Sequence, residues 1–294
     1  MKYEFIDKHR FAFRVEKMCR VLKVSRSGYY TWADRGPSRR EQSNQQLWVK
    51  IRQSYDDSRK TYGSPRITVD LRESGETCNK KRVARLMRIN GIAAKTKRKF
   101  KITTNSKHDH PAAPNLVNQG FVALRPGQLW TSDITYLSTK AGWLYLAVVL
   151  DVFNRQIVGW AMSERLNREL VIASLNQALT HGRRPIKNTI FHSDQGSQYT
   201  SAEFRTLLYN HGLLVSNSGQ GNCYDNAITE TFFHTLKTEL VYFENYQTRE
   251  EARLSVFEYI EVFYNRQRRH SALGYKSPVD FLNKSNYTNS VSVK

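Results

Sequence analysis

Phe191-His192-Ser193-Asp194-Gln195-Gly196-Ser197-Gln198-Tyr199 carries a carboxylate, Asp194, at the end of a short β-like run, 188–191. Thirty-five residues separate Asp194 from Glu230, which lies in a helical pattern that follows Asp225-Asn226. A third acid, Asp133, lies upstream in a strand-like run of aromatic and β-branched residues. We expect the three acids to come from different elements of one sheet-based domain and to meet in space.

Strand and helix patterns alternate through residues 120–285. Short connections at 141–142 and 154–155 predict that the first three strands are antiparallel neighbours. A strand-rich start followed by alternating helices and strands predicts an α/β domain, a mixed five-stranded sheet with helices on both faces. The expected strands are 129–137, 143–152, 156–162, 189–192 and 213–216, and the expected helices are 168–180, 202–211, 226–243 and 249–266.

The three acids are predicted to hold metal ions. A carboxylate in a covered strand, as Asp133 should be, must be paired, hydrogen-bonded or bound to a cation. On the expected helix, Asn226, Glu230 and Lys237 lie within about 40° of one another at 100° per residue, so this polar stripe should face the substrate. Oxygen ligands alone favour Mg²⁺ or Mn²⁺, and two ions would suit phosphodiester chemistry. Any one acid by itself is better explained as a cap or a salt-bridge partner.

Charge is distributed very unevenly along the 294 residues, whose net charge is +20. Residues 1–110 carry 28 Lys/Arg against 11 Asp/Glu, a net of +17, which leaves +3 for the remainder. This concentration of positive charge favours a polyanionic partner such as double-stranded DNA. The alternative is a surface that is basic only for solubility. Three scattered cysteines fit a reducing compartment, and no apolar run suits a membrane span.

The basic first third divides into a short helical segment, 1–40, and a small helix-turn-helix-like domain, 41–92. In the expected helix at 80–90, Val83, Leu86 and Met87 share one face, as a buried face requires. The other faces are basic, as in a helix that enters the major groove; the alternative is a solvated basic helix in a bundle. The predicted DNA contacts on this helix are Lys80, Lys81, Arg82, Arg85 and Arg88.

A basic linker is expected at 93–119. Its residues Lys97, Arg98 and Lys99 can lie along phosphates without reading sequence, or can simply be solvated. The α/β domain then spans 120–285, and 286–294 forms a tail.

Several motifs together resemble a known family. Trp130-Thr131-Ser132-Asp133-Ile134-Thr135-Tyr136, the run from His192 to Tyr199, and Asp225-Asn226-Ala227 leading to Glu230 and Lys237 resemble the catalytic motifs of bacterial insertion-sequence transposases. The similarity is to the second-reading-frame (OrfB) product of the IS-three family, which is related to retroviral integrases. Further similar stretches are Tyr62-Gly63-Ser64-Pro65-Arg66, Arg82 to Met87, Asp151-Val152-Phe153-Asn154-Arg155, Asn265-Arg266, Arg269-His270, Leu273-Gly274-Tyr275 and Ser277-Pro278.

The resemblance implies an RNase H-like integrase core and an enzyme of the DDE type, a polynucleotidyl transferase. Asp133, Asp194 and Glu230 would be its catalytic metal ligands, with Lys237 contacting DNA near the scissile phosphate. The implied reaction is metal-dependent strand cleavage and strand transfer at the element's terminal repeats, into target DNA. The implied setting is a homo-oligomer on DNA in the bacterial cytoplasm, at the nucleoid, with the upstream-reading-frame product as a further partner.

Two other functions remain open from the sequence. An RNase H-like nuclease would cut without strand transfer, and a DNA-binding regulator would keep a vestigial catalytic centre. The presence of all three acids favours the enzyme, and the basic N-terminal third favours duplex DNA as its substrate.

Overall fold

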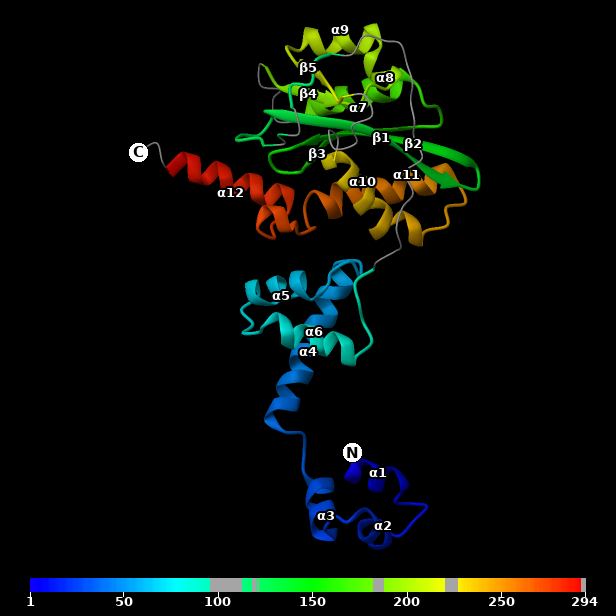
Figure 1. Ribbon diagram of the computed structural model, residues 1–294, viewed down its shortest axis with the longest axis vertical. Helices are drawn as coiled ribbons and strands as arrows, with labels where there is room; N and C mark the ends of the chain where they lie inside the picture. Colours follow the sequence, from blue (N-terminus) through cyan, green and yellow to red (C-terminus); the bar gives the residue numbers. More distant parts are fainter. Residues whose placement is uncertain (96–112, 118–119, 121, 182–187, 220–226, 292–294) are drawn as a thin grey trace. The chain divides into compact units, whose positions relative to one another are not determined.

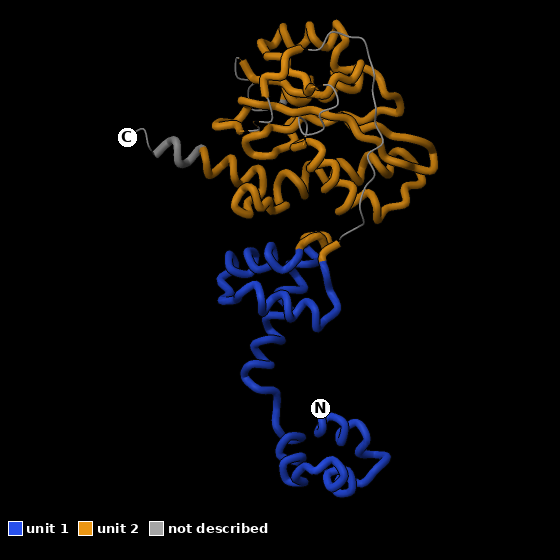
Figure 2. The backbone as a smooth tube through the Cα atoms, viewed as in Figure 1, with its two compact units in different colours: residues 1–57, 63–93 blue, residues 58–62, 94–294 orange. Residues whose placement is uncertain are grey.

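The computed structural model describes residues 1–95, 113–117, 120, 122–181, 188–219 and 227–291. The chain forms two compact units (Figures 1 and 2). Unit 1 comprises residues 1–57 and 63–93, and unit 2 comprises residues 58–62 and 94–294. The expected domain bounds stay predictions. No helix in these described ranges combines the length and the apolarity that crossing a membrane requires.

Unit 1 is all-helical. Its first three helices enclose a small core of Ile6, Met18, Cys19 and Tyr29, and the Tyr29 hydroxyl donates to Asp7 at 3.1 Å. The helices of this part are α1 (Lys2–His9), α2 (Val15–Leu22) and α3 (Arg26–Asp34).

The second part of unit 1 has the predicted three-helix pattern. Pro65 lies in the first turn of α5, as expected, and the Asn79 side chain caps α6 by accepting from the Arg82 amide at 2.8 Å. Val83, Leu86 and Met87 are buried, which confirms the apolar face of α6. The helices of this part are α4 (Arg39–Asp57), α5 (Ser64–Glu73) and α6 (Lys80–Ile89).

Unit 2 is built on the predicted mixed sheet, whose strand order is β3-β2-β1-β4-β5. β1 pairs antiparallel with β2, and β2 with β3, because only a few residues connect each pair. β1 is parallel to β4, and β4 to β5. The strands are β1 (Leu129–Thr139), β2 (Gly142–Asp151), β3 (Ile157–Ser163), β4 (Ile190–Ser193) and β5 (Leu214–Asn217).

Helices cover both faces of the sheet (Figure 1). α7, α8 and α9 close an apolar core that includes Trp130, Val149, Phe191 and Leu175. α10 and α11 pack on the opposite face. The helices are α7 (Arg168–His181), α8 (Ser197–Thr200), α9 (Ala202–Asn210), α10 (Ala227–Glu239) and α11 (Arg249–Phe257).

The C-terminal part departs from the expected helix-and-tail pattern. The helix expected at 249–266 changes from α11 into a π-helical segment, η3 (Glu258–Tyr264). A further helix, α12 (Pro278–Val291), was not predicted. Ser277 accepts from the amide of Asp280 at 3.2 Å and donates to its carboxylate at 2.6 Å, so the sequence did contain a helix-start signal. Short 3₁₀ turns η2 (Val241–Phe243) and η4 (Ser271–Leu273) complete the unit.

A buried ion pair fixes the C-terminal end of α10. Arg268 donates to both carboxylate oxygens of Glu239, at 2.7 and 2.8 Å, and Tyr259 donates to the same carboxylate at 2.8 Å. Burial opposes the charge of Arg268, but the hydrogen bonds to Glu239 hold its pKa above the usual value. The helix is therefore anchored to the chain's C-terminal segment by a pair that water does not screen.

Glu239→Gln should destabilise unit 2, because it leaves the buried Arg268 charge uncompensated. The expected loss is about 3 kcal/mol in the free energy of unfolding, measured by urea denaturation. Glu250→Gln is the matched control: Glu250 is exposed and its partner Arg253 lies 3.3 Å away, so little change is expected. Equal losses in the two variants would contradict an anchoring role for Glu239.

Candidate active site

The pairing of β1 with β4 sets the positions of the two aspartates. Leu129 pairs with Ile190 and Thr131 with His192 in parallel register. Continuing that register for two residues places Asp133 opposite Asp194, on the same face of neighbouring strands about 4.8 Å apart. The sheet thus brings together two acids that lie sixty-one positions apart in sequence.

Asp194 lies just after β4 in a tight turn. Its Oδ1 accepts from the Gly196 amide at 3.0 Å, and its backbone carbonyl accepts from Asn217 Nδ2 at 3.1 Å. A Cβ at position 196 would lie 3.0 Å from that same Oδ1 and 3.1 Å from Gln198 Oε1. Glycine therefore lets the turn close against the carboxylate.

Glu230 reaches the same face from the first turn of α10. The residue before it, Thr229, donates its hydroxyl to that of Thr131 at 2.7 Å, and both side chains are fully buried. Because Thr131 and Asp133 share one face of β1, this bond brings the start of α10 over the aspartates. Glu230 itself is exposed.

Electrostatics link the acids to one another. The pKa of Asp133 lies well above its usual value because of burial first and the Asp194 carboxylate second. Glu230 raises it further, whereas the Ile134 amide, 2.7 Å from Asp133 Oδ1, and Lys237 lower it. The pKa of Glu230 is also raised, because the surrounding chain partly desolvates its carboxylate although the residue as a whole is exposed. Asp133 therefore interacts with both other acids, and more strongly with Asp194 than with Glu230.

A buried tyrosine and a lysine border the acids. Tyr199 makes a hydrogen bond to Ser132 Oγ at 2.9 Å, and its pKa lies well above the usual value because of burial and then of Asp133 and Asp194. Burial lowers the pKa of Lys237, against the attraction of Asp133. Among the described residues, no three His, Cys, Asp or Glu side chains lie close enough together to hold a metal ion.

The predicted DNA contacts of α6 are basic and mostly exposed: Lys80, Lys81, Arg85 and Arg88 point to solvent. Arg82 is only partly exposed, because its guanidinium donates to Asn44 at 2.9 Å and to Ser43 at 2.8 Å. A cavity of about 470 Å³ between α4 and α6 is lined by Arg82 and further cations. Asn226, Lys97, Arg98 and Lys99 lie outside the described residues.

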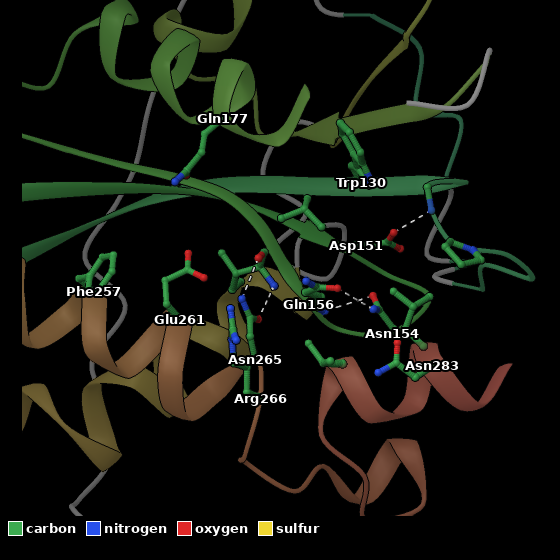
Figure 3. Close-up of a pocket in the computed structure, with 16 residues that line it drawn as sticks. Trp130, Asp151, Asn154, Gln156, Gln177, Phe257, Glu261, Asn265, Arg266 and Asn283 are labelled. Atoms are coloured by element: carbon green, nitrogen blue, oxygen red, sulfur yellow. Dashed lines mark hydrogen bonds between the residues drawn. The ribbon is translucent and has the colours of Figure 1, made fainter. Parts of the chain in front are cut away.

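Sequence reasoning missed the residues that position the acids. The Thr131–Thr229 bond, the Tyr199–Ser132 bond and the Glu239–Arg268 pair carry no recognisable motif of their own. Asp151 lies in one of the stretches that resemble the family. Its carboxylate accepts from the amides of Gly127 at 2.7 Å and Phe153 at 2.9 Å, which gives it a structural role. It also lines a cavity of about 520 Å³ beside β3 and η3 (Figure 3).

Comparison with known proteins identifies the class of molecule that this fold and these acids define. Family models described as "Integrase core domain" match residues 123–223 and 230–285, and one described as "HTH-like domain" matches residues 41–100. The fold class predicted from sequence, an integrase core of the RNase H-like kind preceded by a helical domain, is thereby confirmed.

The relatives extend over almost the whole chain. The transposase InsF for insertion sequence IS3A of Escherichia coli K12 is 46% identical over 287 residues, covering 97% of this chain and 99% of that protein. The insertion element IS600 uncharacterized 31 kDa protein of Shigella sonnei is 46% identical over 91% of this chain and 98% of that protein. The chain belongs to the transposases of the IS3 family of insertion sequences.

Solved structures similar to the chain include two of low sequence identity. A simian T-cell lymphotropic virus intasome in complex with PP2A regulatory subunit B56 gamma is 16% identical, with a TM-score of 0.47 over 75% of this chain and 70% of that one. The catalytic core domain of BIV integrase is 18% identical, with a TM-score of 0.42 over 56% of this chain and 99% of that one.

Asp133→Asn should stabilise the metal-free protein. A carboxyl whose pKa is higher folded than unfolded ionises first in the unfolded chain, so stability falls as pH rises from its unfolded pKa, about 3.9, towards its folded pKa. The variant should therefore melt several degrees above the unmodified protein at pH 8 in EDTA, with the difference vanishing near pH 4. Thermal melting across that range measures it.

Asp57→Asn, at an exposed position in α4, provides the control and should show no such pH dependence. If Asp133→Asn melts no higher than the unmodified chain at pH 8, Asp133 does not experience the proposed burial and repulsion.

Proposed function

We propose that this chain is the catalytic subunit of an insertion-sequence transposase, cutting DNA at the element's ends and joining those ends to target DNA. The observation that supports this most strongly is the β1–β4 register: continued by two residues, it would bring Asp133 opposite Asp194, near the first turn of α10, where Glu230 lies. Membership of the IS3 family supports the same reading.

The donor set fits divalent cations. All three side chains offer oxygen, which Mg²⁺ and Mn²⁺ prefer. Burial first, and then the Asp194 and Glu230 carboxylates, raise the pKa of Asp133, and a bound cation would counter that repulsion between carboxylates. We therefore assign Asp133, Asp194 and Glu230 as ligands of Mg²⁺ or Mn²⁺, with two ions in the active complex. When bound, these ions would supply Lewis-acid stabilisation to the attacking and leaving oxygens.

The three acids differ in how they are held. Asp133 is part of the central strand and Asp194 is fixed by the Gly196 amide, so both should keep their positions when DNA binds. Glu230 projects from the first turn of α10 and is exposed, and we propose that DNA and metal binding bring its carboxylate to the two aspartates. Lys237, two turns further along α10, would hold a phosphate beside Asp133.

Both chemical steps are phosphoryl transfers. In cleavage, the oxygen of water forms a bond to phosphorus at the element's end, the bond from phosphorus to the 3′ oxygen breaks, and that oxygen leaves as a 3′-hydroxyl. In strand transfer, this 3′-hydroxyl forms a bond to a target phosphorus, and the target's own 3′ oxygen leaves with a proton. The carboxylates would orient the attacking and the leaving oxygen and would form no covalent bond to the DNA.

The helical unit would bring the element's ends to the core. Exposed Lys80, Lys81, Arg85 and Arg88 on α6 suit contact with DNA phosphates and base edges. Arg82, oriented by Asn44 and Ser43, suits a fixed phosphate contact. Lys97, Arg98 and Lys99 would add backbone contacts, and Asn226 would lie beside Glu230.

The element has two ends that must be joined to one target, which suits one catalytic chain at each end, so we propose a homo-oligomer assembled on terminal repeats and target DNA. The upstream-reading-frame product would be a further partner in end recognition. The chain would act at the nucleoid of the bacterial cytoplasm, where chromosomal target DNA is found.

Incubation of the full chain with labelled terminal-repeat DNA, target plasmid and Mg²⁺ tests the proposal, with and without the upstream-frame product. Joined products are expected, and Asp133→Asn or Glu230→Gln should reduce them roughly 100-fold or more. Glu203→Gln, in an exposed pair with Arg168, should leave them unchanged.

Each alternative gives a distinct result in this assay. Cut ends without joints would indicate a nuclease. DNA binding without either product, together with transposition in cells that Glu230→Gln leaves unaltered, would indicate a regulator.

The α6 contacts have a separate test. Arg85→Ala should weaken binding to all duplexes alike and reduce the slope of log affinity against log salt by about 0.9, one released counterion. Arg52→Ala is the control, because this arginine of α4 is paired with Asp56 at 2.7 Å. An unchanged slope for Arg85→Ala would remove α6 from the DNA interface.

A further inference from the structure

A groove borders the second half of β1, just beyond Asp133. β4 pairs with Leu129–Thr131 of β1 in the structure, so the later residues of β1 lie past the end of β4, beside the C-terminal part of α10 and η2. A cavity of about 460 Å³ opens here. Its lining includes Tyr136, Trp143, Lys140, Lys237, Tyr242 and Glu244.

Two aromatic side chains form an exposed platform on one wall of this groove, which we call the Tyr136–Trp143 platform. Tyr136 pairs across the strands with Tyr145, so Trp143 is its diagonal neighbour on the same face. The rings meet edge to face, with centroids 5.1 Å apart and planes at 86°. Tyr136 remains 41% exposed and Trp143 51% exposed. Single exposed aromatic residues are common on protein surfaces, whereas two adjacent exposed rings that line one cavity suit the binding of a flat ligand.

Positive charge lies at the side of the platform nearest the acids. Lys237 Nζ lies 5.0 Å from the centre of the Tyr136 ring, and the same lysine is attracted by Asp133. Lys140, on the turn between β1 and β2, adds a second cation, and Glu244 contributes one negative charge. Along β1, Tyr136 is three residues from Asp133, about 10 Å at 3.3 Å per residue, and the two side chains leave opposite faces of the strand. Lys237 connects them, because its Nζ lies over the Tyr136 ring and Asp133 attracts its charge.

A ligand that matches this groove has a flat π face and an anionic group close to it, because Lys237 Nζ lies 5.0 Å from the centre of the Tyr136 ring. A nucleotide has both features. Bases in a duplex hide their faces in the stack, so only an unpaired base can offer one to an aromatic side chain.

We propose that the groove binds an unpaired nucleobase, one or two nucleotides from the phosphodiester held at the acids, stacked on the Tyr136–Trp143 platform with its backbone phosphate at Lys237. This proposal rests on the proposed function, because it takes DNA at the acids as given. It assigns the platform a role in opening the end of the duplex: a base captured there is removed from its partner, which exposes the adjacent phosphodiester to the acids.

The test uses the full chain and terminal-repeat DNA with 2-aminopurine, a base whose fluorescence falls on stacking, placed next to the scissile phosphate opposite a mismatch. Binding itself is followed by the anisotropy of a dye at the far end of the DNA. The unmodified chain should quench the 2-aminopurine. Tyr136→Ala and Trp143→Ala should bind without quenching, and their preference for mismatched over fully paired ends should fall about tenfold.

Two controls separate stacking from other effects. Tyr136→Phe keeps the ring and should restore quenching, whereas a role for the hydroxyl would leave it deficient. Tyr209→Ala removes a tyrosine of α9 that is 82% exposed and should behave as the unmodified chain. If Tyr136→Ala does not fold, Trp143→Ala carries the test alone.

The outcomes distinguish this proposal from the proposed function. Joining of DNA by the unmodified chain without quenching would overturn the platform and leave the function standing. Quenching with no joining under any divalent metal would leave the platform standing and count against the function. Quenching that persists in the Tyr136→Ala, Trp143→Ala double variant would place the base elsewhere and overturn the platform.

Discussion

The parallel pairing of β1 with β4 is the constraint on which the rest of this structure depends. A shift of one residue between these strands would turn Asp133 and Asp194 to opposite faces of the sheet, because side chains alternate along a strand. The pairing is fixed by what lies before the acids: Trp130 and Phe191 are paired in register and both are buried in the core under α7 and α9. Apolar packing thus holds the carboxylates of Asp133 and Asp194 near each other despite their repulsion.

α10 completes the arrangement because it is held at both ends. The Thr229–Thr131 hydrogen bond fixes its start against β1, and the Glu239–Arg268 pair fixes its end against the C-terminal segment. Between these points the helix presents Glu230 and Lys237 along one side. The repulsion at Asp133 is local and the anchors are remote, so the fold tolerates an electrostatically unfavourable site that a cation would convert into a favourable one.

The sequence predicted the elements well where periodicity was strong. All five strands of the sheet are observed within two residues of their expected ends. It did less well where structure depends on partners far away in the chain. α12 and the π-helical segment η3 were missed, since a π-helix reflects tertiary packing rather than local preference. Thr131 and Thr229 look ordinary in sequence and gain their role only when the two elements meet.

The central claim is that Asp133, Asp194 and Glu230 together hold divalent cations at a phosphodiester. Anomalous scattering from crystals of the full chain grown with terminal-repeat DNA and Mn²⁺ tests it most directly. The account predicts manganese peaks within coordination distance, about 2.0–2.3 Å, of carboxylate oxygens from all three residues, next to a DNA phosphate. Manganese bound elsewhere, or bound to the aspartates with Glu230 turned away in the DNA complex, would contradict it.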